Sequence, residues 1–201
     1  MDEHLEQLTE LITKRLFVEV EASGRHVHVT KEQAIRLFGH DLTPSRPLSQ
    51  PGQYLAQERI TVVGPKGKFD GVAVLGPCRS AAQVEISKTD GKVLGLNPPV
   101  RLSGEIGQTP GVMLVGPCGT VKLDQGVIIA QRHIHMSPED AALRKIADGS
   151  LVRLRVLSER PVTFEQVAVR VSPNFRTSAH LDYDEANAGG IRSGDLGILL
   201  P

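Results

Sequence analysis

The sequence is poor in aromatic residues and cysteines and has no excess of charge of either sign. Aromatic residues make up 3% of the 201 residues and tryptophan is absent, so we expect a core of valine, leucine, isoleucine and alanine. The formal net charge is zero, and the lack of a lysine- or arginine-rich run argues against nucleic-acid binding. The two cysteines, Cys78 and Cys118, are interpreted as buried structural thiols rather than a disulfide framework.

The chain also lacks a signal peptide and any long apolar run. These absences predict a soluble, cytosolic protein that does not contact a membrane. The length allows one large domain or two small ones, and an apolar content of 40% suffices for a packed core.

Short apolar runs separated by glycine and proline dominate the chain after residue 16, which is typical of barrels and sandwiches. We therefore predict a mainly β fold with short helices. Strands are predicted at 17–21, 60–63, 72–75, 112–115, 126–130, 151–156 and 167–171. Helices are predicted at 2–16, from Thr30 to Phe38 and from Ser137 to Ile146, and no other segment has a persuasive helical pattern.

One histidine motif occurs twice. Residues 25–30 read Arg-His-Val-His-Val-Thr, and residues 132–137 read Arg-His-Ile-His-Met-Ser. These four histidines and His180 account for five of the seven in the chain, whereas His4 and His40 lie outside the motif and are interpreted as surface residues. The motif indicates a metal-dependent site built from two related halves.

Other segments repeat together with this motif. The pairs are 69–74 with 164–169, 79–85 with 176–182, and 103–107 with 193–197. We interpret residues 17–124 and 125–201 as two diverged copies of one β-rich unit. Together the copies are predicted to form two β-barrels with a shared active site.

The histidine pairs have the spacing of metal ligands on a strand. Side chains two residues apart point to the same side, so His26 and His28 share one face, as do His133 and His135. Two imidazoles supply half of a tetrahedral site, and each pair therefore needs further ligands.

The second repeated segment offers those ligands, as Glu85 in the first copy and His180 in the second. The alignment of the copies does not match them, because it sets Glu85 against Asp182 and His180 against Gln83. Residues 83 and 85 share a strand face, so either position could reach a metal. Imidazole and carboxylate suit zinc, cobalt, manganese and iron, so the metal stays open.

Three arginines accompany these segments. Arg25 and Arg132 precede the histidine pairs and point away from them, so we expect structural ion pairs or dimer contacts. Arg79 lies six residues before Glu85. A guanidinium beside a metal is favourable only with an anion between them, which suggests a substrate bearing phosphate or carboxylate; the alternative is a surface arginine.

A double cupin is the alternative fold that the motif allows. His26 and Glu32, like His133 and Glu139, match its His-x-His-x3-Glu spacing. Both glutamates, however, fall in the first turn of a predicted helix, where an acidic residue commonly complements the helix dipole. A cupin of this kind would be an oxidoreductase or decarboxylase using iron or manganese.

Longer stretches resemble one known family, the PduL-type phosphotransacylases or phosphate propanoyltransferases, over almost the whole chain. The stretches that carry the resemblance are the two histidine motifs and residues 48–54, 79–87, 130–138 and 170–188.

The resemblance implies two β-barrels with short capping helices, the first combining N- and C-terminal segments. It also implies two metal ions, usually zinc, and a reaction that interconverts acyl-CoA and phosphate with acyl phosphate and CoA. The metal ligands implied are His26, His28 and Glu85 for one ion, and His133, His135 and His180 for the other. Arg79 is implied to face phosphate, with Ser103 near the same substrate.

The resemblance also bears on chemistry and location. We expect phosphate to attack a propanoyl or acetyl thioester directly, without an acyl-enzyme. Relatives in bacterial microcompartments, such as those for propanediol degradation, often begin with a targeting helix. Residues 1–16 are expected either to bind shell or core proteins in this way or to pack on a barrel. A homodimer is expected, and a non-catalytic metal-binding scaffold is the third functional hypothesis.

Overall fold

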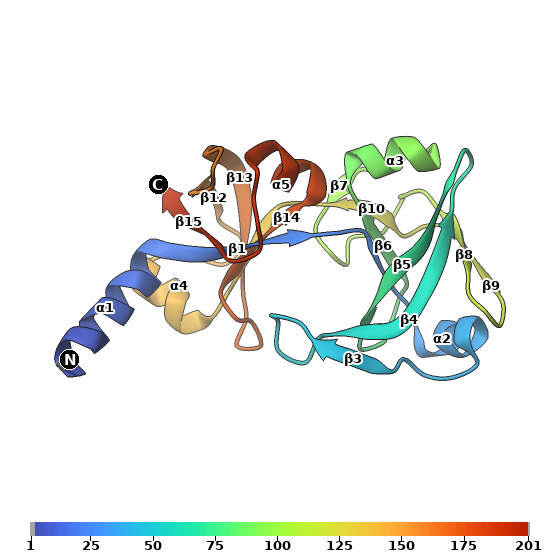
Figure 1. Ribbon diagram of the computed structural model, residues 1–201, viewed down its shortest axis with the longest axis horizontal. Helices are drawn as coiled ribbons and strands as arrows, with labels where there is room; N and C mark the ends of the chain where they lie inside the picture. The colour runs from blue at the N-terminus through green and yellow to red at the C-terminus, as the bar shows by residue number, and fades with distance from the viewer. Residues whose placement is uncertain (1–2, 201) are drawn as a thin grey trace. The chain divides into compact units, whose positions relative to one another are not determined.

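The computed structural model describes residues 3–200, which form two compact units (Figure 1). The terminal unit joins the segment up to Ser23 with the segment from Arg132 onward, and the central unit is Gly24–Gln131. No helix within residues 3–200 is both long and apolar enough to span a membrane.

The terminal unit is a closed six-stranded barrel in the order β1-β14-β11-β13-β12-β15. Its strands are β1 (Phe17–Ser23), β11 (His133–Met136), β12 (Leu151–Val156), β13 (Val162–Val171), β14 (Ser178–Asp182) and β15 (Asp195–Leu200). Its helices are α1 (Glu3–Leu16), α4 (Pro138–Arg144) and α5 (Tyr183–Gly189). Aliphatic side chains such as Val20, Ile134 and Leu154 fill the core, as the scarcity of aromatics predicts.

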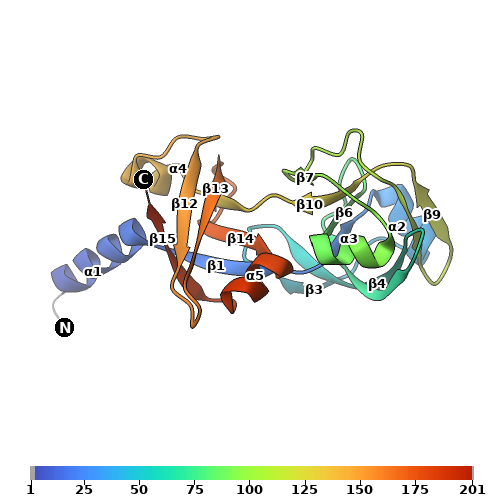
Figure 2. The same cartoon turned by 90° about the horizontal axis from the view of Figure 1, so that it is seen from above.

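The central unit is a curled, nine-stranded sheet that forms a half-barrel (Figure 2). Its main order is β7-β10-β6-β2-β5-β4-β8-β9, with β3 paired to β4. The strands are β2 (His26–His28), β3 (Pro44–Pro47), β4 (Tyr54–Val63), β5 (Lys68–Gly76), β6 (Gln83–Ile86), β7 (Val100–Arg101), β8 (Val112–Val115), β9 (Thr120–Leu123) and β10 (Val127–Ala130). The helices are α2 (Lys31–Phe38) and α3 (Lys88–Leu94). The predicted mainly β class with short helices is confirmed.

Helices α3 and α5 are a correction to the sequence analysis, which predicted neither. Each contains a glycine, Gly91 or Gly189, and glycine lowers helix propensity. Both nevertheless begin with a complete capping box, from Ser87 and from Asp182. These caps, two residues after the predicted ligands Glu85 and His180, were the signal that could have revealed the helices.

The first strand of each sequence copy pairs with a strand of the other copy. Strand β1 precedes β2 in the chain but pairs in parallel with β14, and β10 precedes β11 but pairs in parallel with β6. The chain therefore passes from one unit to the other just before each histidine motif. This exchange explains why the compact units divide at Ser23 and Gln131, although the copies were assigned to residues 17–124 and 125–201.

Arg25 and Arg132 form the ion pairs that their position predicted. Arg25 donates to Asp90 at 2.7 Å and lies over the Phe69 ring, 4.1 Å from its centre. Arg132 repeats the arrangement with Glu185, at 2.5 Å, and with the ring of Phe164. Because Asp90 and Glu185 belong to the capping boxes, each arginine ties the start of a histidine strand to a helix N-terminus.

Candidate metal centres

The central cluster consists of His26 and His28 on β2 and Glu85 on β6. Antiparallel pairing sets His26 opposite Glu85 and His28 opposite Gln83. Oε1 of Glu85 lies 3.6 Å from Nε2 of His26 and 3.9 Å from Nε2 of His28. All three side chains are buried, and their ligand atoms lie within 4.8 Å of one another.

The terminal cluster consists of His133 and His135 on β11 and His180 on β14. Here His133 lies opposite His180, and His135 lies opposite Ser178. The three ring centres are 4.7 to 5.1 Å apart, and the ligand atoms again lie within 4.8 Å of one another. The structure thus brings together both predicted sets of three residues.

The strand registers correct the alignment of the two copies. Glu85 faces His26 as His180 faces His133, so Glu85 corresponds to His180 and not to Asp182. Asp182 corresponds instead to the helix cap Ser87. The sequence alignment was two residues out of register, an error that keeps every side chain on the same strand face and so leaves the expected pattern intact.

The donor atoms of both clusters fit a divalent metal ion. Imidazole nitrogens and a carboxylate oxygen are the usual ligands of zinc, and three protein ligands leave a position open for a reactant. Nδ1 of His26 lies 2.9 Å from the carbonyl oxygen of Gly24, to which it donates when it carries the ring proton. In the neutral ring, that hydrogen bond leaves Nε2 free of a proton and directed at the cluster, as is usual for metal-binding histidines.

Burial and mutual charge set the protonation of the central cluster. Burial opposes ionisation of Glu85, but His26 and His28 outweigh it and hold the Glu85 pKa well below its ordinary value. Burial likewise opposes charge on His26, yet Glu85 raises the His26 pKa. Burial and the nearby charges of His26 and Arg79 hold the pKa of His28 well below its ordinary value, so this ring is a neutral, ligand-competent imidazole.

These shifts predict a pH dependence of stability in protein freed of metal by a chelator. A lowered Glu85 pKa stabilises the fold above pH 4.5, its ordinary value, and this contribution is lost on acidification. A raised His26 pKa stabilises the fold below pH 6.5 and is lost as pH rises. Glu85→Gln should therefore lower the free energy of unfolding, measured with urea, by the largest amount between pH 4.5 and pH 6.5. A decrease that keeps growing as the pH falls below 4.5 would contradict this prediction.

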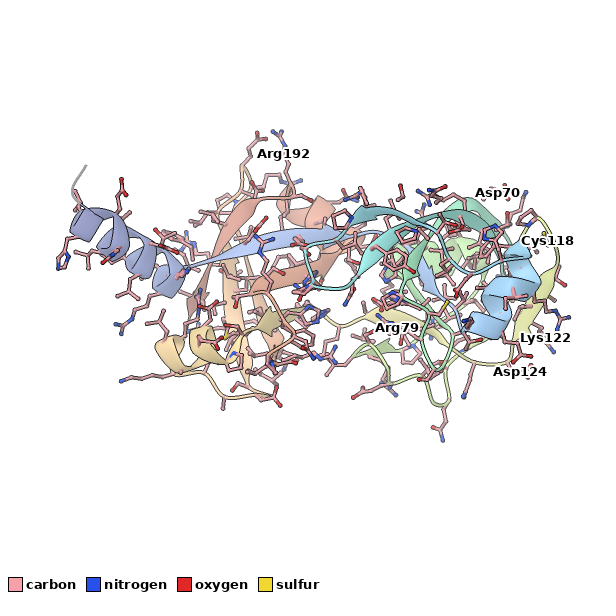
Figure 3. The ribbon with its side chains drawn as sticks, turned by 90° about the horizontal axis from the view of Figure 1, so that it is seen from below. Asp70, Arg79, Cys118, Lys122, Asp124 and Arg192 are labelled. Carbon is pink, nitrogen blue, oxygen red and sulfur yellow. The ribbon has the colours of Figure 1, made fainter. Side chains whose placement is uncertain are left out.

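Arg79, labelled in the central unit in Figure 3, is joined to the central cluster through Ser103. Its Nη1 donates to Oγ of Ser103 at 2.9 Å, and that hydroxyl donates to Oε1 of Glu85 at 3.0 Å. The buried amide of Gln83 donates to Glu85 and to Ser103 and accepts the backbone N–H of Gly104. The backbone N–H of Arg79 donates to the carbonyl of Val29, which fixes the loop that carries the guanidinium. Arg79 is therefore more than a surface arginine.

The corresponding loop of the terminal unit, between β13 and β14, brings an aromatic ring to its cluster. The centre of the Phe175 ring lies 4.1 Å from that of His135, and the Arg170 guanidinium lies 5.8 Å from Phe175. Sequence reasoning missed Phe175, although it is the one aromatic residue in that loop. The two clusters thus differ in their surroundings, with a cation beside one and an aromatic ring beside the other.

The remaining candidates from the sequence lie outside both clusters. Glu32 and Glu139 are exposed in the first turns of α2 and α4, so the cupin arrangement is not formed. His4 and His40 are exposed, as predicted. The prediction of two buried thiols is wrong for Cys118, which is exposed in the bend between β8 and β9. Cys78 is partly buried, and burial and Asp41 raise its pKa.

Comparison with known proteins agrees with the resemblance noted in the sequence. Residues 19–192 match the family model of phosphate propanoyltransferases. A phosphate propanoyltransferase of Clostridioides difficile is 46% identical, covering 100% of this chain and 97% of its own length. Those of Leptotrichia buccalis and Salmonella typhimurium are 52% and 48% identical, covering 90% and 84% of this chain and 86% and 81% of their own lengths. The chain belongs to the phosphate propanoyltransferase family of acyltransferases.

Proposed function

We propose that the protein transfers a short acyl group, propanoyl or acetyl, between coenzyme A and phosphate. Family membership supports acyl transfer to phosphate. The observation that carries the proposal is the chain of contacts from Arg79 through Ser103 to Glu85, which sets an anion-binding guanidinium beside a cluster of metal-ligand type. An acceptor bearing several negative oxygens satisfies both the guanidinium and a cationic centre.

Two divalent ions, with zinc the best match to the donors, are proposed as cofactors. His26, His28 and Glu85 would hold one, and His133, His135 and His180 the other. When bound, such ions supply Lewis acidity that neutralises phosphate and polarises a thioester carbonyl.

The protein's own residues would orient the reactants. Arg79 offers paired N–H groups to two phosphate oxygens, and Ser103 holds that side chain in place. A phosphate oxygen then attacks the carbonyl carbon, a C–O bond forms, the C–S bond breaks, and its electron pair leaves on sulfur. The CoA thiolate is a good leaving group, so the step requires no strong general acid.

Direct transfer predicts that no acyl group is trapped on the protein. The raised pKa of Cys78 keeps its thiol protonated and poorly nucleophilic, and neither cysteine belongs to a cluster. After mixing with propanoyl-CoA without phosphate, the intact mass should be unchanged. A propanoyl adduct on Cys78 or Cys118 that persists without phosphate, and that disappears at the rate of turnover when phosphate is added, would contradict direct attack.

The proposed activity is tested by release of free thiol from propanoyl-CoA. We expect release only when phosphate is present, with acyl phosphate formed in equal amount and detected as the hydroxamate. Sulfate at equal ionic strength is the control and should not support release. Thiol release without phosphate would indicate a thioesterase, and bound metal without turnover would favour the scaffold hypothesis.

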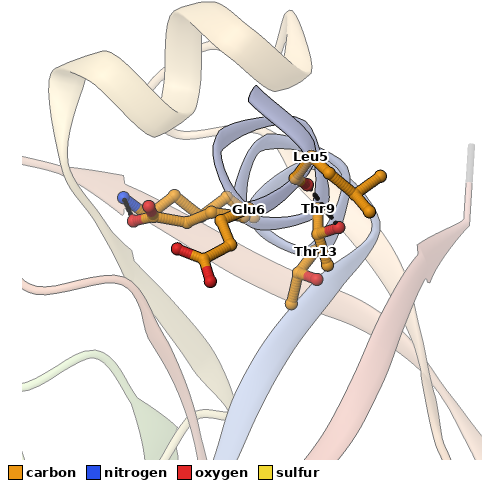
Figure 4. A pocket seen from close by; sticks show the side chains of 6 residues that line it. Leu5, Glu6, Thr9 and Thr13 are labelled. Atoms are coloured by element: carbon orange, nitrogen blue, oxygen red, sulfur yellow. Dashed lines mark hydrogen bonds and ion pairs between the residues drawn. The ribbon is translucent and has the colours of Figure 1, made fainter. Parts of the chain in front are cut away.

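For α1 we propose a targeting role, with shell or core proteins of a bacterial microcompartment as partners. Its apolar side chains are all about half exposed, namely Leu5, Leu8, Leu11, Ile12 and Leu16. A pocket on the surface of α1 is lined by residues of this one helix (Figure 4). The hydrogen bonds from Arg144 to the carbonyls of Arg15 and Phe17 hold the C-terminal end of the helix against α4.

Deleting residues 1–16 should therefore spare catalysis and abolish encapsulation. A finer comparison replaces Leu8 and Ile12 by glutamine, with Glu6→Gln and Glu10→Gln on the polar face as the control. Co-purification with microcompartments should fall only for the apolar pair. Lost activity in the deletion variant would instead favour a helix that packs on the barrel. We also expect the protein to sediment as a homodimer in analytical ultracentrifugation.

A further inference from the structure

The central cluster belongs to a row of side chains that crosses four neighbouring strands. Strands β10, β6, β2 and β5 pair in that order. Their registers align Ile128 with Glu85, Glu85 with His26, and His26 with Ala73. The row therefore reads isoleucine, glutamate, histidine, alanine, with its carboxylate in the second position.

The terminal cluster belongs to an equivalent row. Strands β1, β14, β11 and β13 pair in that order, with the same alternation of parallel and antiparallel neighbours. The registers align Glu21 with His180, His180 with His133, and His133 with Ala168. This row reads glutamate, histidine, histidine, alanine. Each row holds one carboxylate, and in the terminal unit it stands one strand further out.

The geometry around His180 gives Glu21 a specific neighbour. Oε2 of Glu21 lies 3.8 Å from Nδ1 of His180, and the Glu21 side chain is 21% exposed. Nε2 of the same ring lies 3.0 Å from Oγ of Ser178. Because β14 lies between β1 and β11, Glu21 and His133 flank His180 from opposite sides. The nitrogen nearest Glu21 is thus Nδ1, and Nε2, beside the Ser178 hydroxyl, is the other nitrogen that the ring can offer to a metal.

We propose that Glu21 is a positioning residue for the terminal cluster: its carboxylate, 3.8 Å from Nδ1 of His180, closes to hydrogen-bond distance when a metal ion binds, accepts the Nδ1 proton and so makes Nε2 the ligand atom. This inference rests on the proposed metal-binding role of that cluster. A carboxylate on the far nitrogen of a metal-binding histidine fixes the ring and increases its basicity. It also returns to the terminal site the negative charge that Glu85 supplies directly in the central one.

The test counts metal ions and measures their affinity by competition with a chromophoric chelator, independently of turnover. Glu21→Ile copies the isoleucine of the central row and should weaken one of two sites about 10- to 100-fold while the other is unchanged. Glu19→Ala is the matched control, since it removes another carboxylate from β1. The Glu19 carboxylate accepts a hydrogen bond from Arg176 at 2.6 Å. It should leave both sites unchanged.

A second variant separates positioning from a merely structural role. Glu21→Ile combined with His180→Glu rebuilds the central row within the terminal unit and should restore tight binding at the weakened site. In Glu21→Ile, the cobalt(II) absorption of one of the two sites should change. In the double variant, the spectrum should again show two occupied sites. Two unchanged sites in Glu21→Ile, or a double variant no better than the single one, would overturn the role of Glu21. If metal binds as expected but the wild type turns over no acyl-CoA, the proposed reaction fails and this inference stands.

Discussion

Replacing Glu85 by glutamine should lower the rate of phosphate-dependent thiol release by about 10³-fold or more. The change removes the one carboxylate of the central cluster and also disturbs the hydroxyl of Ser103 that holds Arg79. Lewis-acid stabilisation of the reacting charges is worth several kcal/mol, and about 4 kcal/mol corresponds to that loss in rate. Steady-state kinetics together with metal analysis measures both effects.

The matched control is Glu105→Gln, which removes an exposed carboxylate from the same loop as Ser103. It should change neither rate nor metal content. If Glu85→Gln keeps both near the wild-type values while the fold is intact, Glu85 is not a ligand and the central cluster is structural.

Arg79→Ala should reduce turnover about 10²- to 10³-fold, the range seen when one preorganised donor to a developing charge is removed. The larger part of the loss should appear as a higher KM for phosphate, because the guanidinium is proposed to bind that reactant. Arg79→Lys keeps the charge but loses the planar pair of donors, so it should recover only part of the activity. Kinetics at varied phosphate separates these effects.

Arg101→Ala offers a control, since Arg101 is exposed and donates only locally, to the carbonyl of Val100. A phosphate KM that is unchanged in Arg79→Ala, with normal turnover, would show that Arg79 merely stabilises the loop through its contacts with Ser103 and Val29.

The alternation of side chains along a strand made the clusters predictable. His26 and His28 share a face for any strand, and so do His133 and His135, whatever the rest of the fold. The short helices after them followed from Thr30 and Ser137, whose caps are local signals. The histidine pairs and the helices that follow them both depend on neighbours in sequence, and both were predicted.

Apart from helices α3 and α5, whose caps are local signals, what was missed depends on partners distant in the chain. The equivalence of Glu85 and His180 is set by strand register, which similar letters in the two copies obscured. Glu21 reaches His180 only because β1 pairs with β14, whose paired residues lie 159 positions apart in the chain, a contact that no local pattern encodes.

The central claim is that two metal clusters and an arginine perform acyl transfer to phosphate, and metal reconstitution tests it most directly. Protein freed of metal by a chelator is titrated with zinc while CoA thiol release from propanoyl-CoA and phosphate is recorded. The account predicts no turnover without metal and full recovery only as the second equivalent per chain binds. Undiminished turnover in metal-free protein, or full recovery with a single equivalent, would contradict it.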